Sequence, residues 1–452
     1  MTEGIPLDEE NASAAARSVL DHAGADDVEV VLLGSETGIT RYARSEIIQN
    51  TTRREIRGFV RVVVGDRSAT ATTNQLSREH LSRAADSALE AAKAAPEDPD
   101  WHGLARPDEV GRADPIRKWD QVTAEASPGD RARSIAEIVA AAGENAAGVF
   151  ETSAHSYGVF TSTGIHCFDA NTRCVATCLV DTGESTGWAE ASSHAVGQVD
   201  PAEPAQRAAK KAAMGMGAID LTPDNYDVLL EAPAAAVLID YLAFSGFGAK
   251  QVLEGESFLA TRKGQTVASS SVTIADDAGH PASIGIGFDF EGVPRKRAVV
   301  IDHGVALDPL TDMRTAAKLG LPLTGHGSGS NEVGPYAANV VLEAGDTPAE
   351  DLKAGITDGL LVTRFHYVNV LDRPSTLMTG MTRDGTFRIR NGEIAEPVHN
   401  LRFTQSALGA LASTVAVGDD LRLFAPEWTA FGSTAAPSLR IADFRFTSAT
   451  TH

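Results

Sequence analysis

The sequence is poor in cysteine, in long apolar runs and in clusters of positive charge. Its 452 residues include only three cysteines, Cys167, Cys174 and Cys178. This odd, sparse count, together with an N-terminus that lacks a signal-peptide pattern, predicts free thiols and a cytoplasmic protein. No uncharged apolar run reaches the ~18 residues that span a bilayer. The formal net charge of −22 argues against nucleic acid or an anionic membrane as the main partner.

Metal-binding patterns are also missing. The twelve histidines never pair three or four residues apart, and HExxH is absent. A metal site built from His166, Cys174 and Cys178 is conceivable, but its spacing matches no zinc pattern. Cys174 and Cys178 are separated by an even number of residues, so on a strand they face the same side. We expect both to be small, buried, apolar side chains and not metal ligands.

The order of expected elements predicts an α+β protein with two domains. Residues 1–220 alternate helical and strand-like stretches, which indicates an antiparallel sheet with flanking helices. Helix, strands and helix occur twice there, as an internal duplication or as a common α+β arrangement. Residues 221–452 are expected to form a β-rich domain that contains one buried helix. An Asn391-Gly392 pair predicts a tight hairpin in it.

The buried helix is predicted at residues 233–248, PAAAVLIDYLAFSGFG. A proline suits its first turn, glycines suit its end, and its apolar character on all sides predicts deep burial. Only Asp240, Tyr241 and Ser245 interrupt it with polar atoms. A carboxylate inside such a helix is costly unless it is paired, so we expect Asp240 to have a hydrogen-bonding or charged partner.

A glycine-rich loop, GHGSGSNEVG at 325–334, carries further polar candidates. His303, His326 and Ser328 are candidate substrate-binding residues, because histidines at loop ends can titrate near neutrality and a glycine-rich loop can cradle an anion. A flexible surface or substrate-flanking loop with solvated histidines is the favoured interpretation.

Four long stretches resemble one known family, the TldD/PmbA proteins related to metalloproteases. They are TRYARSEIIQNTTRREIRGFVRVVVG, in which Asn50 falls in the family's Gln-Asn turn, and the segment from GVPRKRAVVIDHG to GHGSGS. The other two are GTFRIRNGEIAEPVHNLRF and VAVGDDLRLF. The last three are most similar to the TldE branch.

In the catalytic TldD branch, a helix carries HExxxH and a later cysteine completes a zinc site. The resemblance places that helix on 233–248. It then puts Asp240 at the first histidine, Tyr241 at the glutamate and Ser245 at the second histidine. No His or Cys lies anywhere in 195–279, so a slip of register would not restore a ligand.

The third ligand is expected soon after residues 417–421, yet no cysteine follows Cys178. Zinc catalysis needs three protein ligands and an open position. The resemblance therefore implies the zinc-free TldE-like partner subunit, with zinc expected only in a TldD-like HExxxH subunit. Ligands five residues apart differ by about 500° around a helix, so they converge only on a distorted helix. Without them we predict a regular helix with no π-bulge at 241–245.

Three functions remain open. The leading hypothesis is a non-catalytic subunit of a cytoplasmic two-component zinc metalloprotease that acts on peptides or modified peptides. The second is a stand-alone, zinc-independent amide or peptide hydrolase that uses Asp240, Tyr241, Ser245, His303 and His326. The third is a non-catalytic homodimeric binding protein.

Overall fold

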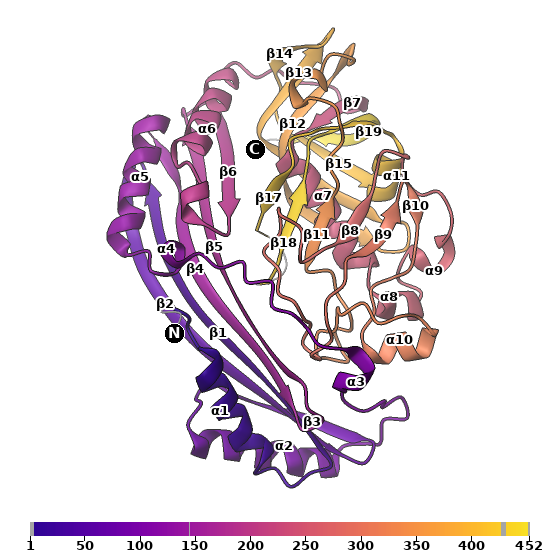
Figure 1. Cartoon of the computed structure of the whole chain (residues 1–452). Helices are drawn as coiled ribbons and strands as arrows, with labels where there is room; N and C mark the ends of the chain where they lie inside the picture. The colour runs from indigo at the N-terminus through magenta and orange to yellow at the C-terminus, as the bar shows by residue number, and fades with distance from the viewer. Residues whose placement is uncertain (1–3, 144, 426–430, 451–452) are drawn as a thin grey trace.

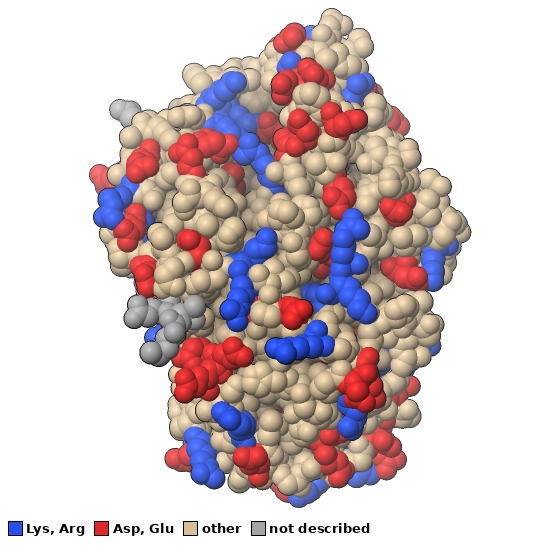
Figure 2. Space-filling view, in the orientation of Figure 1, with Lys and Arg blue, Asp and Glu red and all other residues tan. Residues whose placement is uncertain are grey.

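The computed structural model describes residues 4–143, 145–425 and 431–450, and its fold is α+β (Figure 1). One long six-stranded antiparallel sheet forms the N-terminal half, and a six-stranded and a seven-stranded sheet form the C-terminal half. No helix among the described residues is long and apolar enough to cross a membrane. Acidic and basic side chains are interspersed over the face in Figure 2, and several Lys and Arg side chains follow the seam between the halves.

The N-terminal sheet has the strand order β3-β2-β1-β4-β5-β6. Its strands are β1 (Asp27–Ala43), β2 (Glu46–Val64), β3 (Arg67–Thr73), β4 (Ala146–Thr161), β5 (His166–Asp181) and β6 (Thr186–Ser193). The helices beside it are α1 (Glu9–Leu20), α2 (Arg78–Ala94), α4 (Gln121–Ala124), α5 (Pro128–Ala142), η1 (Val196–Gln198) and α6 (Ala202–Met214), while α3 (Pro107–Val110) lies on the arm that crosses to the C-terminal half. The unit of helix, three strands and helix therefore occurs twice, and the two units meet where β1 pairs with β4.

The strand boundaries correct one expectation. The Gln-Asn turn at Asn50 does not exist, because β2 runs through it and Asn50 pairs with Thr40 of β1. The chain turns instead at Arg44 and Ser45, whose φ angles are 52° and 61°. Two successive residues with positive φ make the tight turn that antiparallel strands favour. Most of the first part of β2 is solvent-exposed, which explains its polar, turn-like composition.

The C-terminal half contains a six-stranded sheet and a strand barrel. The sheet order is β10-β9-β8-β11-β18-β17, and the other path is β12-β7-β19-β15-β13-β14 with β16 on β19. A β12–β13 pairing closes the second path into the barrel. The strands are β7 (Asn225–Leu230), β8 (Ile274–Asp276), β9 (Ala298–Asp302), β10 (Val305–Ala306), β11 (Asn339–Leu342), β12 (Asp358–Asp372), β13 (Leu377–Arg390), β14 (Glu393–Pro397), β15 (Leu401–Ser406), β16 (Thr414–Val417), β17 (Arg422–Phe424), β18 (Ser433–Ala436) and β19 (Leu439–Ala449).

Short helices complete this half around one long buried helix, α7. The long helix is α7 (Ala232–Gly246), and the short ones are α8 (Ala249–Leu253), α9 (Leu259–Arg262), α10 (Met313–Leu319), η2 (Ala349–Asp351) and α11 (Ala407–Ala412). The predicted hairpin is confirmed, since Asn391 and Gly392, with φ of 48° and 81°, join β13 to β14.

The central strands of the long sheet, β1, β4 and β5, are largely buried on both faces. Val28, Val30 and Leu32 of β1 pack with α1 and α2, as the period-two alternation of a strand requires. Val31, between them, faces the other way and joins a cluster with Phe288 of the C-terminal half. The two halves thus share one apolar core along the inner face of the sheet.

The contact between β6 and α6 gives a stability prediction. A methyl group added at Gly187 of β6 would lie 2.1 Å from the carbonyl oxygen of Ala208 and 2.5 Å from the amide nitrogen of Ala212. Because both are backbone atoms of α6, Gly187→Ala should lower the free energy of unfolding by about 1–3 kcal/mol in urea titrations. Gly197→Ala is the control, because its methyl group would meet nothing within 4 Å. Equal stability of the two variants would contradict this packing.

Candidate functional site

Helix α7 is the element on which the sequence places a site. Pro233 occupies its first turn, and the helix is regular from Ala232 to Gly246. The prediction of a helix without a π-bulge at 241–245 is confirmed. It packs against β12, β18, β11 and α11. Burial on all sides is wrong at one edge, because Val237 and Asp240 are half-buried and Phe244 is 48% exposed.

The three polar residues of α7 point to different partners. The Thr434 hydroxyl donates to the Asp240 carboxylate at 3.0 Å, so Asp240 has the hydrogen bond that was expected. The Tyr241 hydroxyl donates to the Val368 carbonyl at 2.6 Å. The Ser245 hydroxyl donates to the Tyr241 carbonyl of its own helix at 2.7 Å. The three side chains therefore do not converge.

This arrangement does not fit zinc. A zinc site needs at least three donors directed at one point, with an open position for water. The Ser245 hydroxyl is fully buried and bonded to the helix backbone, and the Tyr241 phenol is bonded to β12. Among the described residues, no group of three or more His, Cys, Asp or Glu side chains is placed to hold a metal ion.

A cleft of about 210 Å³ opens beside the half-buried edge of α7. It lies between the halves, because β6 contributes Trp188 and Glu190, while α7, β12, β18 and the segment from β17 to Ala425 supply the rest. Its lining comprises Trp188, Glu190, Pro233, Ala236, Val237, Asp240, Arg364, Phe365, Phe424, Ala425 and Thr434. None of these is a histidine or a cysteine.

The one positively charged side chain in the described lining of this cleft, Arg364, contacts an aromatic ring and a carboxylate. The Arg364 guanidinium lies 4.5 Å from the centre of the Trp188 ring, and its Nε donates to Asp384 at 2.7 Å. Burial raises the pKa of Glu190, against the lowering effect of a hydrogen bond that the Ser192 hydroxyl donates at 2.7 Å. The cleft thus offers two carboxylates, Glu190 and Asp240, and can accept hydrogen bonds from a polar ligand.

His326 lies beneath the glycine-rich loop and not on its surface, contrary to the expectation of a solvated histidine. It is 0% exposed, and its Nε2 is 3.0 Å from Oδ1 of the buried Asp276. The other oxygen of Asp276 accepts from the amides of Ala338 and Asn339. Burial alone would raise the pKa of Asp276, but the His326 imidazole lowers it to about 2. The His326–Asp276 pair therefore holds the start of the loop at 325–334 against the end of β8.

His303 and Ser328 lie in different surroundings. The His303 side chain is 78% exposed in a left-handed turn, and its Nδ1 is 2.9 Å from Asp302. Ser328 is half-buried, donates to the Ser330 carbonyl and lines a larger cavity between the halves. The structure therefore brings neither His303, His326 nor Ser328 together with α7.

The cysteines are buried and free. Cys174 and Cys178 lie on one side of β5 in the same core cluster, as their parity predicts, and His166 is exposed at the start of that strand. Burial raises the pKa of the Cys174 thiol to about 12. A thiol with such a pKa is unreactive, which fits the role of a small apolar side chain.

One pattern of nucleophilic hydrolases does occur in the sequence, G-x-S-x-G at 183–187. It covers the turn after β5 and the first two residues of β6, so it joins two strands, whereas a nucleophile elbow joins a strand to a helix. The hydroxyl of Ser185 donates to the Ala212 carbonyl. The pattern therefore forms part of the packing of β6 on α6.

Comparison with known proteins finds two family models. The model of the PmbA/TldA metallopeptidase C-terminal domain matches residues 223–448, and that of PmbA/TldA metallopeptidase domain 1 matches residues 28–92. The crystal structure of TldE from Thermococcus kodakarensis superposes with a TM-score of 0.85 at 19% identity. It covers 96% of this chain and 100% of that chain, so the fold is shared.

Relatives are also found by sequence. A metalloprotease of Methanothermobacter thermautotrophicus is 29% identical over 229 residues, 50% of this chain and 49% of the relative. A zinc metalloprotease TldD homolog of Saccharolobus solfataricus is 26% identical over 152 residues, 31% of this chain and 32% of the relative. The chain thus spans half or less of the length of these curated relatives.

The buried His326–Asp276 pair predicts a pH-dependent contribution to stability. The pKa of folded Asp276 is about 2, below its ordinary 3.8. The contribution, about 2 kcal/mol, is therefore complete above about pH 4 and is lost as the pH falls towards 2. Asp276→Asn should remove it, which urea titrations between pH 7 and pH 3 would measure. Asp302→Asn, in the exposed His303 pair, is the control and should change stability by less than about 0.5 kcal/mol. A variant at Asp276 as stable as the wild type would show that the pair contributes nothing.

Proposed function

The chain belongs to the PmbA/TldD metallopeptidase family, and from that membership we propose that it is the non-catalytic subunit of a two-chain zinc protease. The catalytic partner is a TldD-like chain that carries HExxxH and holds the zinc. The substrates are peptides or modified peptides in the cytoplasm. The matched domain, residues 223–448, contains the whole of α7 and both C-terminal sheets, which supports the assignment.

One observation carries the proposal: the divergence of Asp240, Tyr241 and Ser245 on a regular helix. Each of these side chains has its own protein partner, and two of the three partners are backbone carbonyls. A chain that keeps the family's fold without the donors for its metal is best explained as a structural or gating member of an assembly. Extended peptides commonly add to sheet edges, and this chain is rich in strands.

A second function is favoured by the cleft beside α7. Asp240 and Glu190 both line it, and the raised pKa of Glu190 is a property that general acids share. The alternative is therefore a zinc-independent amide or peptide hydrolase that acts alone. It lacks an activated nucleophile in the described lining, which is why we place it second.

Association is the first prediction of the leading proposal. This chain should co-purify with a co-expressed HExxxH-bearing family member in one complex. Cleavage of peptides should appear only when both chains are present, and a zinc chelator should abolish it. The control complex carries His→Ala at the first HExxxH position of the partner and should assemble without cleaving. Two chains that elute apart, or a lone homodimer in light scattering, would contradict the proposal.

Asp240→Asn separates the two functions. A non-catalytic Asp240 predicts a cleavage rate of the two-chain complex within about twofold of the wild type, since the amide can still accept from Thr434. Asp302→Asn, half-exposed and outside the lining of the cleft, is the matched control. Chelator-resistant cleavage by this chain alone, lost in Asp240→Asn and kept in Asp302→Asn, would instead establish the hydrolase.

A further inference from the structure

A second cavity lies between the halves, away from α7. Its volume is about 490 Å³, within the range of small-molecule sites. The N-terminal sheet forms one wall, and the loop at 325–334 with Phe290 and Phe431 forms the other. Its lining comprises Glu29, Val31, Leu33, Phe59, Arg61, Ser68, Ala69, Thr70, Trp101, Phe290, Ser328, Gly329, Ser330, Asn331, Glu332 and Phe431. We refer to it as the chamber.

The body of the chamber is apolar. Val31 and Leu33 alternate along β1 on its inner face, and Phe59 lies directly opposite Val31 on β2. Across from them, the rings of Phe290 and Phe431 pack edge to face with their centres 5.4 Å apart. These side chains would cover an aliphatic or aromatic group on two sides.

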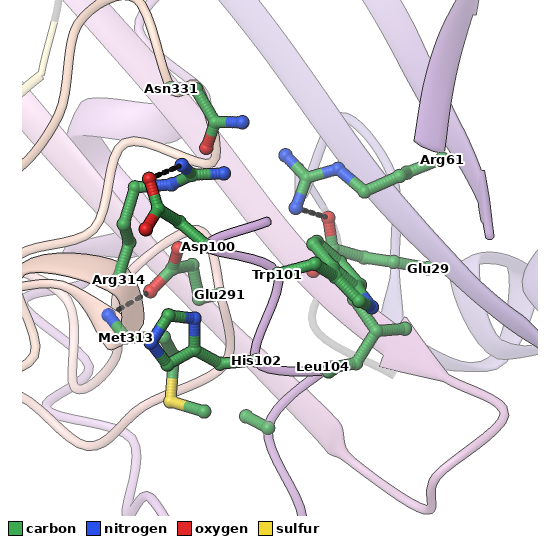
Figure 3. A pocket seen from close by; sticks show the side chains of 12 residues that line it. Glu29, Arg61, Asp100, Trp101, His102, Leu104, Glu291, Met313, Arg314 and Asn331 are labelled. Carbon is green, nitrogen blue, oxygen red and sulfur yellow. Dashed lines mark hydrogen bonds and ion pairs between the residues drawn. The ribbon is translucent and has the colours of Figure 1, made fainter. Parts of the chain in front are cut away.

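One end of the chamber adjoins a small acidic recess of about 30 Å³ (Figure 3). Glu29, Arg61, Trp101 and Asn331 line both spaces. The recess adds Asp100, Glu291 and Arg314, which face Glu29 and Arg61 from the other side of Trp101. A space of this size holds one or two water molecules or one ammonium group.

Glu29 is the buried charge at this junction. Its residue is 3% exposed, and Arg61 Nη1 lies 3.3 Å from one carboxylate oxygen. Within the described residues this ion pair is its one polar contact, and no hydrogen bond reaches its carboxylate. Burial raises its pKa, Arg61 opposes that rise, and the nearby charge of Asp289 adds to it. A carboxylate so placed would gain from a donor in the recess.

The basic groups of the recess are already engaged. Arg61 donates to the Gly329 carbonyl, and Arg314 donates to both carboxylate oxygens of Asp98. Glu291, in contrast, accepts one hydrogen bond, from the Met313 amide at 2.9 Å. Of the three carboxylates that line the recess, Asp100 is paired with Lys318 and lies 3.6 Å from Arg314, so Glu29 and Glu291 remain for a donor of the ligand. Burial, with the charges of Asp289 and Asp312 nearby, raises the pKa of Glu291 well above its ordinary value, and a cation beside it would favour its ionised form.

We propose that the chamber and the recess together bind a primary ammonium compound with an apolar body. The ammonium group lies in the recess and donates to Glu29 and Glu291, and the body lies among Phe59, Phe290 and Phe431. A small free amine and the N-terminus of a peptide with an apolar first residue both have this chemistry. The site does not depend on a zinc partner, so it stands or falls separately from the proposed function.

Calorimetry on the whole purified chain tests the proposal with matched probes. 2-Phenylethylamine should bind about tenfold or more tightly than 2-phenylethanol, which has the same body without the charge, and than 3-phenylpropionate, which carries the opposite charge. Phenylalanyl-glycinamide, compared with its N-acetyl derivative, tests the peptide N-terminus. Binding of the free amine alone identifies a small amine as the ligand, and binding of the dipeptide amide identifies a peptide.

Variants locate the site. Glu29→Gln should weaken binding of the amine about tenfold or more and leave the weak binding of the alcohol unchanged. Glu36→Gln, on the same strand but outside the chamber, is the control and should change neither. Phe59→Ala should weaken the amine and the alcohol alike. If the wild type binds the amine no better than the alcohol or the carboxylate, or if Glu29→Gln folds and binds it normally, the proposal is wrong.

Discussion

The burial of the central strands of the N-terminal sheet on both faces is the constraint from which the rest of the structure follows. One face is covered by helices and the other by the C-terminal half, so polar groups on the inner face must find partners inside the protein. Asp169 of β5 is 1% exposed, and its carboxylate accepts hydrogen bonds from the amide of Ile116 on the arm and from that of Gly287 in the C-terminal half. The same constraint places Glu29 against Arg61, at the junction of two cavities.

Helix α7 packs at the centre of the C-terminal half. The helix still closes the core between the barrel and the six-stranded sheet, and this packing requires apolar residues at most of its positions. The two histidine positions and the glutamate position that the resemblance places on this helix hold Asp240, Ser245 and Tyr241. Each has a separate hydrogen bond: Asp240 with β18, Tyr241 with β12 and Ser245 within the helix. What remains beside the helix is a polar cleft between the halves. A site of this kind is consistent with a function that depends on assembly.

The sequence predicted features that depend on local chemistry. The α+β class, a helix that begins at Pro233 and the Asn391-Gly392 hairpin follow from periodicity, composition and turn preference. The hydrogen-bonded Asp240 follows from the cost of burying a carboxylate, and the absence of a π-bulge was implied by the family resemblance. Features that depend on tertiary contacts were not predictable. The turn at Arg44 uses residues without a turn signature. His326 is buried because its partner, Asp276, comes from fifty residues earlier in the chain. Glu29 resembles any charged residue near the start of a strand, and its burial depends on the C-terminal half.

The proposed role of this chain is to assemble with an HExxxH-bearing partner, which alone holds the catalytic zinc. The most direct measurement is the zinc content and peptidase rate of each purified chain and of their mixture, before and after chelation and zinc restoration. The account predicts that zinc remains with the HExxxH chain, that this chain binds no stoichiometric zinc, and that cleavage returns only when both chains and zinc are present. Stoichiometric zinc on this chain alone, or cleavage by it without the partner, would contradict the account.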